Sequence, residues 1–447
     1  MTGRVLVLEF NELSPTLMDQ FISQGHLPSF RRLRDESATF ITEAGEQEGR
    51  LNPWVQWVTA HTGATAAEHG IERLGEAGQL RLPTIADAVT ASGGSVWLCG
   101  AMNVHPISAV RGCVLPDPWS VDAVPQPREL QPFFRFVSAN VKEHTSAVTP
   151  LSKRDAVAFV RFMVRHGLSF GTARATVRQL IGERTHRAER WQRAELLDRF
   201  QWDVFSYYFR RTRPTFATFF SNSTAHFQHL YWTEMERQPS GSAVLDGYVQ
   251  MDTIVDKALE LAGSDVTVVL CTALSQTANH DETEYEGFYR PHKVDTLVDE
   301  IGVHGVTSTA PMMAEQSHVF FVDDDAAAEG ERLLTSVRAD SEPAFDVRRS
   351  GTDIVLGSRF FSRRPAGTML ELPDGRRLSF DDHFYWSDSP REGTHHPDGI
   401  LWIQHARSDE RDARVPLTAV APTLLSVLGI ERPPSMHDEL LVAAQWG

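Results

Sequence analysis

Short apolar runs that end in polar residues recur along the chain. They occupy residues 4–10, 95–100, 214–221 and 265–271, and their interiors are mostly apolar. Such runs are typical of strands that are buried on both faces of a parallel sheet. Ligands of open α/β sheets bind at the carboxyl ends of the strands. Glu9 and Asn11, at the end of the first run, are therefore candidate site residues.

Helical patterns fill the stretches between these runs. Apolar residues recur at helical spacing in residues 14–24, 29–36, 82–92 and 242–262, and we expect a loop over residues 37–51. Asn52 suits an N-cap, Pro53 suits the first position of a helix, and Gly63 suits its end. Strands that alternate with helices in this way predict an α/β fold with a mostly parallel central sheet.

Two stretches depart from this alternation. Residues 127–211 are helical in pattern and rich in basic residues, and we interpret them as a helical insertion or lid, with helices at 153–166 and 188–209. Residues 285–380 combine short strands and a hairpin turn with one helix, which predicts a small α+β subdomain. The α/β core would then comprise residues 1–126, 212–284 and 381–447.

Composition and charge narrow the class of protein. The chain has 447 residues, enough for a large core, and its net charge of −16 argues against a broad nucleic-acid interface. No run resembles a signal peptide or reaches membrane-spanning length, so we expect neither a membrane partner nor secretion. Cys99, Cys113 and Cys271 lack metal-ligand spacing and favour a reduced, cytoplasmic protein. The oligomeric state stays open.

Several short motifs follow one another over nearly the whole chain. They are the first strand with its terminal acid, Thr62-Gly63, the segments 69–71 and 229–232, Gly393-Thr394-His395, and the run 421–436. In this order they resemble the alkaline phosphatase superfamily, in particular its type I phosphodiesterases and nucleotide pyrophosphatases. The resemblance implies a three-layer α/β/α sandwich and an enzyme that acts on phosphate, sulfate or related esters.

The resemblance also implies two metal ions, but the residues for them are incomplete. His229 and His395 stand at histidine positions of one site, whereas Ala225 replaces its aspartate. In the other site the first-strand position holds Glu9, and the Asp-His pair is replaced by residues 273–274, an Ala and a Leu. The nucleophile segment, residues 52–54, contains no hydroxyl group. The family's second metal site and its covalent phospho-enzyme therefore cannot form from these residues.

We therefore predict one remodelled metal site. His229 and His395 would bind a divalent ion, with Glu9 as third ligand or general base and His226 in place of the lost aspartate. Two histidines and a carboxylate suit zinc or manganese in hydrolysis, and equally iron or copper in redox chemistry.

Polar side chains near the strand ends complete the predicted site. Asn52 and Gln56 would contribute to catalysis by holding an oxyanion at a helix N-terminus, and Asn11 would line the catalytic site at the end of the first strand. Gln276 and His396 would contact the small, anionic substrate. Small and apolar replacements elsewhere in the site leave a third hypothesis, a non-catalytic binding protein. The metal that remains after purification distinguishes the three hypotheses. A hydrolase would retain zinc or manganese, a redox enzyme iron or copper, and a binding protein no metal.

Overall fold

The computed structural model describes residues 3–45, 51–120, 123–143, 152–185, 190–279, 287–313, 315–389, 391–408, 410–437 and 441. The chain divides into two compact units. The larger unit comprises Met1–Val137, Lys153–Asn279 and Glu392–Gly447, and the smaller comprises Ser138–Ser152 and His280–Arg391. This division does not test the finer boundaries predicted for the insertion and the subdomain, which stay predictions.

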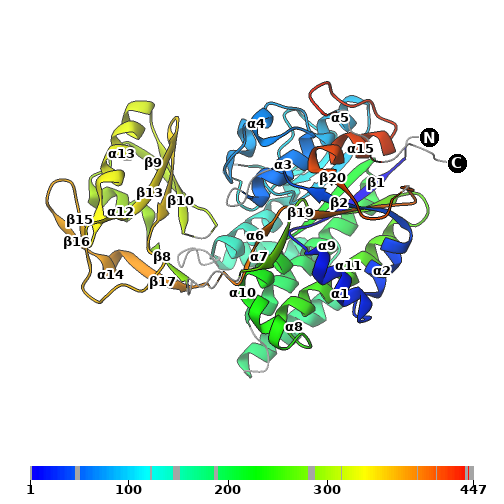
Figure 1. Cartoon of the computed structure of the whole chain (residues 1–447), viewed down its shortest axis with the longest axis horizontal. Coiled ribbons are helices and arrows are strands. Elements are labelled where there is room, and N and C mark those ends of the chain that lie inside the picture. Colours follow the sequence, from blue (N-terminus) through cyan, green and yellow to red (C-terminus); the bar gives the residue numbers. More distant parts are fainter. Residues whose placement is uncertain are drawn as a thin grey trace. The chain divides into compact units, whose positions relative to one another are not determined.

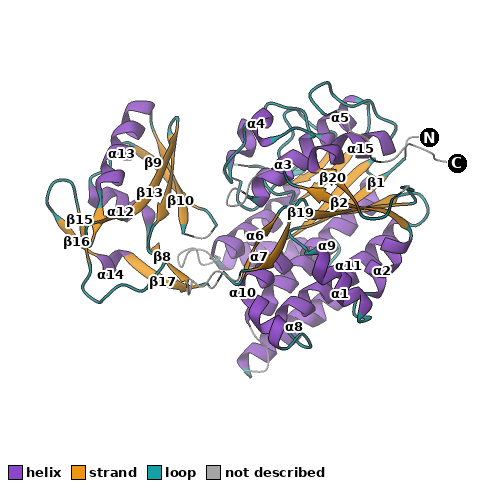
Figure 2. Cartoon of the chain, viewed as in Figure 1, coloured by secondary structure: helices purple, strands orange, loops and turns teal. Residues whose placement is uncertain are grey.

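The larger unit is built on an eight-stranded sheet with β1 (Val5–Phe10) near its middle (Figure 2). All six residues of β1 are buried, and the strand pairs in parallel with β5 (Phe216–Ser221) and β6 (Thr267–Cys271). The strand order is β20-β2-β19-β6-β1-β5-β3-β4. The other five strands are β2 (Ser37–Glu43), β3 (Val96–Cys99), β4 (Gly112–Leu115), β19 (Asp398–Gln404) and β20 (Ala413–Pro416). Within this sheet β19 pairs antiparallel with both neighbours and the other pairings are parallel, which confirms the predicted class.

Helices cover both faces of this sheet (Figure 1). One face carries α3 (Pro53–Thr62), α4 (Ala66–His69), α5 (Ile85–Ala91) and α15 (Val420–Val427). The opposite face carries α1 (Pro15–Ser23), α2 (Pro28–Asp35), α9 (Arg193–Thr212) and α11 (Ala243–Ala262). The expected three-layer α/β/α sandwich is therefore present.

Local sequence signals set the ends of α3. The helix begins at Pro53, as expected, and ends at Gly63, whose φ of 59° lies in the left-handed region. A Cβ atom at Gly63 would lie 3.2 Å from the backbone oxygen of Thr418 and 3.1 Å from Pro422. Glycine is therefore favoured at this position both for its φ angle and for the close approach of the chain.

The expected loop over residues 37–51 is wrong in its first half. Residues 37–43 form β2, which pairs with β19 from Ser37–Gln404 to Glu43–Asp398. This strand mixes polar with apolar residues, so its own pattern carries little signal. Its pairing partner lies more than 300 residues further along the chain, and the pairing is therefore invisible to a local reading of the sequence.

The stretch expected to be helical contains α6 (Gln131–Glu143), α7 (Lys153–Arg165) and α8 (Phe170–Arg184) in addition to α9. Residues 188–189, at the start of the predicted helix 188–209, lie outside the described residues. A further helix, α10 (Ser223–Arg237), follows β5 directly and carries the candidate histidines His226 and His229. Within the described residues, no helix is long and apolar enough to cross a membrane.

The smaller unit is an α+β structure with its own apolar core around residues such as Leu297, Val319 and Phe360. Two four-stranded sheets have the orders β13-β14-β10-β9 and β12-β11-β15-β16. Their strands are β9 (Val306–Pro311), β10 (Gln316–Phe321), β11 (Arg338–Ala339), β12 (Glu342–Pro343), β13 (Phe345–Ser350), β14 (Asp353–Ser358), β15 (Met369–Glu371) and β16 (Arg377–Ser379). The unit also contains the pair β8 (Gly287–Pro291) and β17 (Phe384–Asp388), with α12 (Val294–Ile301), α13 (Asp324–Ser336) and α14 (Phe380–His383).

Candidate metal centre

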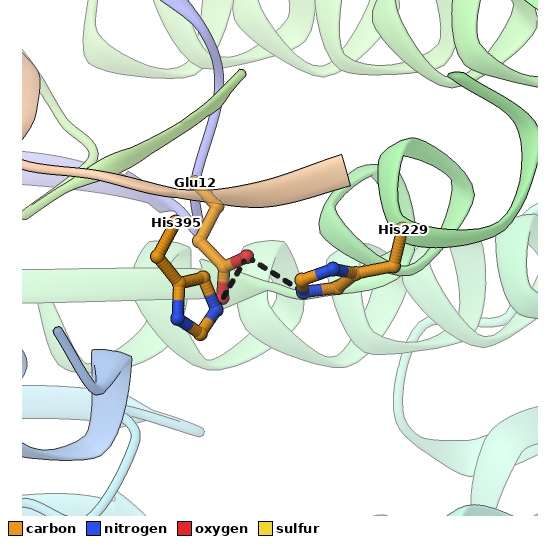
Figure 3. Close-up of side chains that lie close together, drawn as sticks. All are labelled: Glu12, His229 and His395. Carbon is orange, nitrogen blue, oxygen red and sulfur yellow. Dashed lines mark ion pairs between the residues drawn. The ribbon is translucent and has the colours of Figure 1, made fainter. Parts of the chain in front are cut away.

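Three side chains converge in the larger unit, where β1, β5 and β6 end. They belong to Glu12, His229 and His395, and Figure 3 shows both imidazole rings turned toward the carboxylate. The Oε2 atom of Glu12 lies 3.2 Å from Nε2 of His229 and 3.4 Å from Nε2 of His395. Each residue contributes one ligand atom, and the three atoms lie within 4.8 Å of one another.

Glu12 is held in an unusual backbone conformation just beyond β1. Its φ angle is 61°, in the left-handed region that residues other than glycine rarely adopt. Its backbone oxygen accepts a hydrogen bond of 2.8 Å from Nε2 of Gln228, and Oε1 of Gln228 accepts one of 2.8 Å from Tyr248. Backbone strain of this kind persists where the surroundings enforce it, and it is concentrated at functional sites.

His229 lies on α10 and is oriented by a backbone carbonyl. Its Nδ1 atom lies 2.9 Å from the oxygen of Gly393, which only accepts hydrogen bonds, so Nδ1 carries a hydrogen. Nε2 then either carries a second hydrogen or presents a lone pair to Glu12. A lone pair that faces a carboxylate is stable only with a cation between the two groups. Metal-binding histidines typically have this arrangement, in which the other ring nitrogen donates to a carbonyl.

His395 lies on β18 (Gly393–His396), which pairs antiparallel with β7 (Ser275–Ala278) and places His395 opposite Gln276. The amide of Gln276 donates a short hydrogen bond to Oε2 of Glu12 and one of 3.0 Å to the backbone oxygen of Ala225. A Cβ atom at Gly393 would lie 2.4 Å from Oε1 of Gln276. Glycine at this position therefore lets the amide reach the carboxylate.

Asn11 holds the other carboxylate oxygen. Its Nδ2 atom lies 2.6 Å from Oε1 of Glu12 and 2.7 Å from Oδ1 of Asn222. Its own Oδ1 accepts a hydrogen bond of 2.7 Å from Nε1 of Trp57, a residue of α3. A buried amide with partners on three elements is well ordered, so Asn11 fixes the direction in which Glu12 points.

The electrostatics favour an ionised carboxylate at Glu12. Burial would raise the pKa of this carboxyl group, since its side chain is only 3% exposed. His395 and His229 outweigh burial through their charge and hydrogen bonds, and the net effect is a lowered pKa. An ionised carboxylate that faces two imidazoles is a suitable donor set for a divalent cation.

The spacing of the donor atoms fits a metal ion. In a tetrahedral zinc site with bonds of about 2.0–2.2 Å, two ligand atoms are roughly 3.3–3.6 Å apart. The separations of 3.2 and 3.4 Å between Glu12 and the two histidines match this geometry closely. Two of the three donor-atom pairs therefore have the spacing of a His₂-carboxylate site, and the donor atoms of His229 and His395 lie within 4.8 Å of each other.

Glu9, the predicted third ligand, is not part of this cluster. Its Oε1 lies 2.7 Å from Nε2 of His61, and both side chains are at most 3% exposed. Side chains alternate along a strand, and this alternation turns Glu9 toward α3 and α15, where Leu424 lines the same small cavity. The carboxylate of the cluster comes instead from Glu12, three residues further along the chain.

The other predicted site residues are dispersed. His226 is exposed on α10, and His396 is half-exposed with its Nδ1 atom 4.0 Å from Asp398, and neither joins the group of three ligands. Asn52 precedes α3 but its side chain makes no capping hydrogen bond. The Nε2 atom of Gln56 is buried without a hydrogen-bond partner among the described residues. Of the predicted residues, the structure brings together His229, His395, Gln276 and Asn11.

The sequence analysis missed Glu12 and its supports, Gln228, Tyr248 and Trp57. One signal for Glu12 was present, because an acid that follows the end of a buried strand is at the correct edge of the sheet. The supports carried no such signal: Gln228 and Tyr248 lie inside helical patterns that are also typical of core residues.

No protein-family model and no curated protein matches the sequence. Solved structures with a similar arrangement include phosphonoacetate hydrolase from Sinorhizobium meliloti 1021 in complex with phosphonoacetate, with 12% identity, 96% of each chain covered and a TM-score of 0.46. They also include murine ectonucleotide pyrophosphatase/phosphodiesterase 5 in complex with AMP, with 10% identity, 99% of this chain and 100% of that chain covered and a TM-score of 0.46. Alkaline phosphatase PafA has 12% identity, 98% of each chain covered and a TM-score of 0.48.

These proteins belong to the superfamily that the sequence motifs resemble. At such identities and TM-scores the similarity concerns the arrangement of elements, and it carries no argument about the reaction of this chain. The chemistry of the site is therefore argued from its own residues.

Proposed function

We propose that this chain is a metal-dependent enzyme that binds one divalent cation through Glu12, His229 and His395. The observation that carries the proposal is the placement of both Nε2 atoms at 3.2 and 3.4 Å from one buried carboxylate oxygen. The hydrogen bond of His229 to Gly393 supports it, because that bond leaves Nε2 free to act as a ligand. For hydrolysis, this donor set suits zinc or manganese.

The reaction that we propose is hydrolysis or group transfer at a phosphate, sulfate or related ester. A cation bound at the cluster would act as a Lewis acid that neutralises charge on an ester oxygen. His229 and His395 are partly exposed, with side-chain exposures of 32% and 25%, so a substrate can approach from their side. Asn11 and Gln276 keep the carboxylate of Glu12 fixed during the reaction.

The nucleophile would be water, because no hydroxyl side chain stands in the segment 52–54. Asn52 and Gln56 stay candidates for binding the anionic group at the N-terminus of α3, and the buried, unpaired Nε2 of Gln56 supports this role. Glu9 is turned away from both histidines, which would favour the binding-protein hypothesis if no other carboxylate reached them. Glu12 supplies that carboxylate and thereby favours an enzyme.

Metal content tests the site directly. The full chain, purified without chelators, is expected to retain about one zinc or manganese ion per molecule. His229→Ala and Glu12→Gln are expected to lose that ion, whereas the matched control His226→Ala, an exposed histidine on the same helix, keeps it. Retention of the full metal content by His229→Ala would falsify the site.

Hydrolysis of chromogenic esters tests the reaction. Nitrophenyl phosphate, bis-nitrophenyl phosphate and nitrophenyl sulfate represent the three ester classes, and at least one is expected to be hydrolysed by the metal-loaded chain and not by His395→Ala. If the purified chain contains iron or copper and hydrolyses none of these esters, redox chemistry at the same three ligands would replace the proposed hydrolysis. A chain that binds none of these metals would be a binding protein.

A further inference from the structure

The helices α7 and α8 of the larger unit carry apolar side chains on the outside. Val157, Val160 and Val164 of α7 are 69%, 57% and 68% exposed, and their spacing places them on one side of the helix. On the opposite side, Phe159 and Phe162 pack against aromatic rings of α6 and α9. The valines therefore point away from the body of the unit.

The next helix repeats this pattern after a turn of four residues, 166–169. Phe170 is 85% exposed, and Val177, Leu180 and Ile181 are each more than half exposed. Of the twelve exposed large apolar side chains in the described part of the chain, seven lie between residues 157 and 181. This concentration distinguishes the two helices from the remaining surface, where exposed apolar residues are scattered singly.

Basic side chains flank both apolar stripes. The two helices carry six exposed arginines: Arg154, Arg161, Arg165, Arg174, Arg178 and Arg184. None of the six forms an ion pair with another described residue. Their positive charge stands in contrast to the net charge of −16 of the whole chain. The exposed valines, Phe170, Val177, Leu180, Ile181 and these arginines are termed the α7–α8 surface.

We propose that the α7–α8 surface binds the interface of an anionic phospholipid bilayer. Apolar stripes bordered by arginines match the chemistry of that interface, because the apolar side chains enter the acyl boundary and the guanidinium groups meet lipid phosphates. The helices are 13 and 15 residues long, so they lie on the bilayer and do not span it. The sequence analysis expected no membrane partner because the chain has no membrane-spanning segment. Binding at the bilayer interface does not require such a segment.

The positive charge of the α7–α8 surface argues against the alternative that this surface forms the interface of a symmetric dimer. A two-fold symmetric contact places the same patch of both copies against each other, so two patches of like positive charge would be brought together. Lipid phosphates supply the opposite charge for all six. The proposal is independent of the metal centre, since none of its residues belongs to that site.

Co-sedimentation with vesicles tests the proposal with the full chain. Binding is expected to vesicles that contain phosphatidylserine and not to vesicles of phosphatidylcholine alone, and it is expected to weaken as salt is raised. Phe170→Glu and the pair Arg161→Glu with Arg174→Glu are each expected to weaken binding at least about tenfold. The matched control Val322→Glu, at an exposed apolar position of the smaller unit, leaves binding unchanged.

Two results would overturn the proposal. One is a lack of binding to anionic vesicles by wild-type protein whose circular dichroism shows it to be folded. The other is a dimer in vesicle-free solution that Phe170→Glu converts to monomer, which would make the surface an interface between copies. Because all the substitutions are at exposed positions, each variant is expected to unfold at the wild-type temperature, and its binding can be compared directly.

Discussion

Two carboxylates at the end of β1 each face histidine, and their surroundings differ. Glu9 contacts His61 at 2.7 Å inside the core, and Glu12 contacts His229 and His395 at the end of the sheet. Both glutamates are 2% exposed. The histidine side chains differ, since that of His61 is 3% exposed and those of His229 and His395 are 32% and 25% exposed.

The core contact of Glu9 and the proposed site around Glu12 therefore differ in solvent access and in hydrogen bonding. The cavity beside Glu9 and His61 has a volume of about 10 Å³, hardly enough for one water molecule. Oε2 of Glu9 and Nδ1 of His61 are buried without partners among the described residues. Both oxygens of Glu12 have partners, and its histidines face outward. We therefore propose ligand binding for the outer group, Glu12 with His229 and His395, and a structural role for the inner pair, Glu9 and His61.

The largest effect is expected from breaking the inner pair. Glu9→Leu leaves His61 buried without its partner and should lower the free energy of unfolding by about 3–5 kcal/mol. The double variant Glu9→Leu with His61→Phe removes both polar groups and should recover most of this loss. Denaturant unfolding of the metal-free proteins measures both changes.

Metal content provides the control for this experiment. The folded fraction of Glu9→Leu should bind as much zinc as the wild type, because Glu9 does not contact the outer group. Loss of zinc in this variant, with the fold intact, would return Glu9 to the role of a ligand that the sequence suggested.

The course of β1 explains why the sequence indicated the wrong glutamate as the partner of His229 and His395. A strand pattern locates the edge of the sheet at which chemistry occurs, and Asn11 and Glu12 both lie at that edge. The pattern does not show that Glu12 adopts a φ of 61°, since residues other than glycine rarely do so. That turn brings Glu12 to the histidines. The conformation is set by the hydrogen bond from Gln228, which is distant in sequence.

The sheet itself was largely predictable, because fully buried strands such as β1, β5 and β6 carry their signal in their own residues. The strand β2 could not be predicted from its own residues, because its position depends on pairing with β19. The histidines of the site were identified through motif resemblance, and their positions on α10 and β18 bring them to one carboxylate. The supporting contacts are long-range, and the sequence contains no local sign of them.

The next largest effect is expected from filling the outer site. Zinc at a free concentration one hundred times its Kd should stabilise the chain by about 2.7 kcal/mol, because the folded state alone presents the three ligands together. Glu12→Gln should abolish this stabilisation. Thermal unfolding with and without zinc measures the effect, and an equal shift in both proteins would show that zinc binds elsewhere.

A smaller effect is expected from the amide that holds Glu12. Gln276→Met keeps the side chain's length and removes the donor to Oε2, so Glu12 is less firmly oriented. Loss of such a supporting contact typically weakens metal binding by about 10–100-fold. A competition titration with a zinc indicator measures this change, and His396→Gln on the adjacent strand serves as a control that should leave the affinity unaltered. An unchanged affinity in Gln276→Met would assign the amide to substrate, as first expected.

The smallest effect on metal affinity is expected at Trp57, the residue that links the two regions. Its ring lines the cavity beside Glu9 and His61. Its Nε1 atom donates a hydrogen bond of 2.7 Å to Oδ1 of Asn11. Trp57→Phe keeps an aromatic ring and removes that donor, which should cost roughly 1–3 kcal/mol of stability through the unpaired oxygen of Asn11.

Metal affinity in Trp57→Phe should fall by less than about tenfold, because Asn11 still donates to Glu12 and retains its contact with Asn222. The comparison with Gln276→Met is the informative one, since both substitutions remove one hydrogen bond of the same network. If Trp57→Phe weakens zinc binding as strongly as Gln276→Met, the network acts as one unit from α3 to the carboxylate. The inner and outer regions would then be coupled through Asn11, and the separation between a core pair and a metal site would no longer hold.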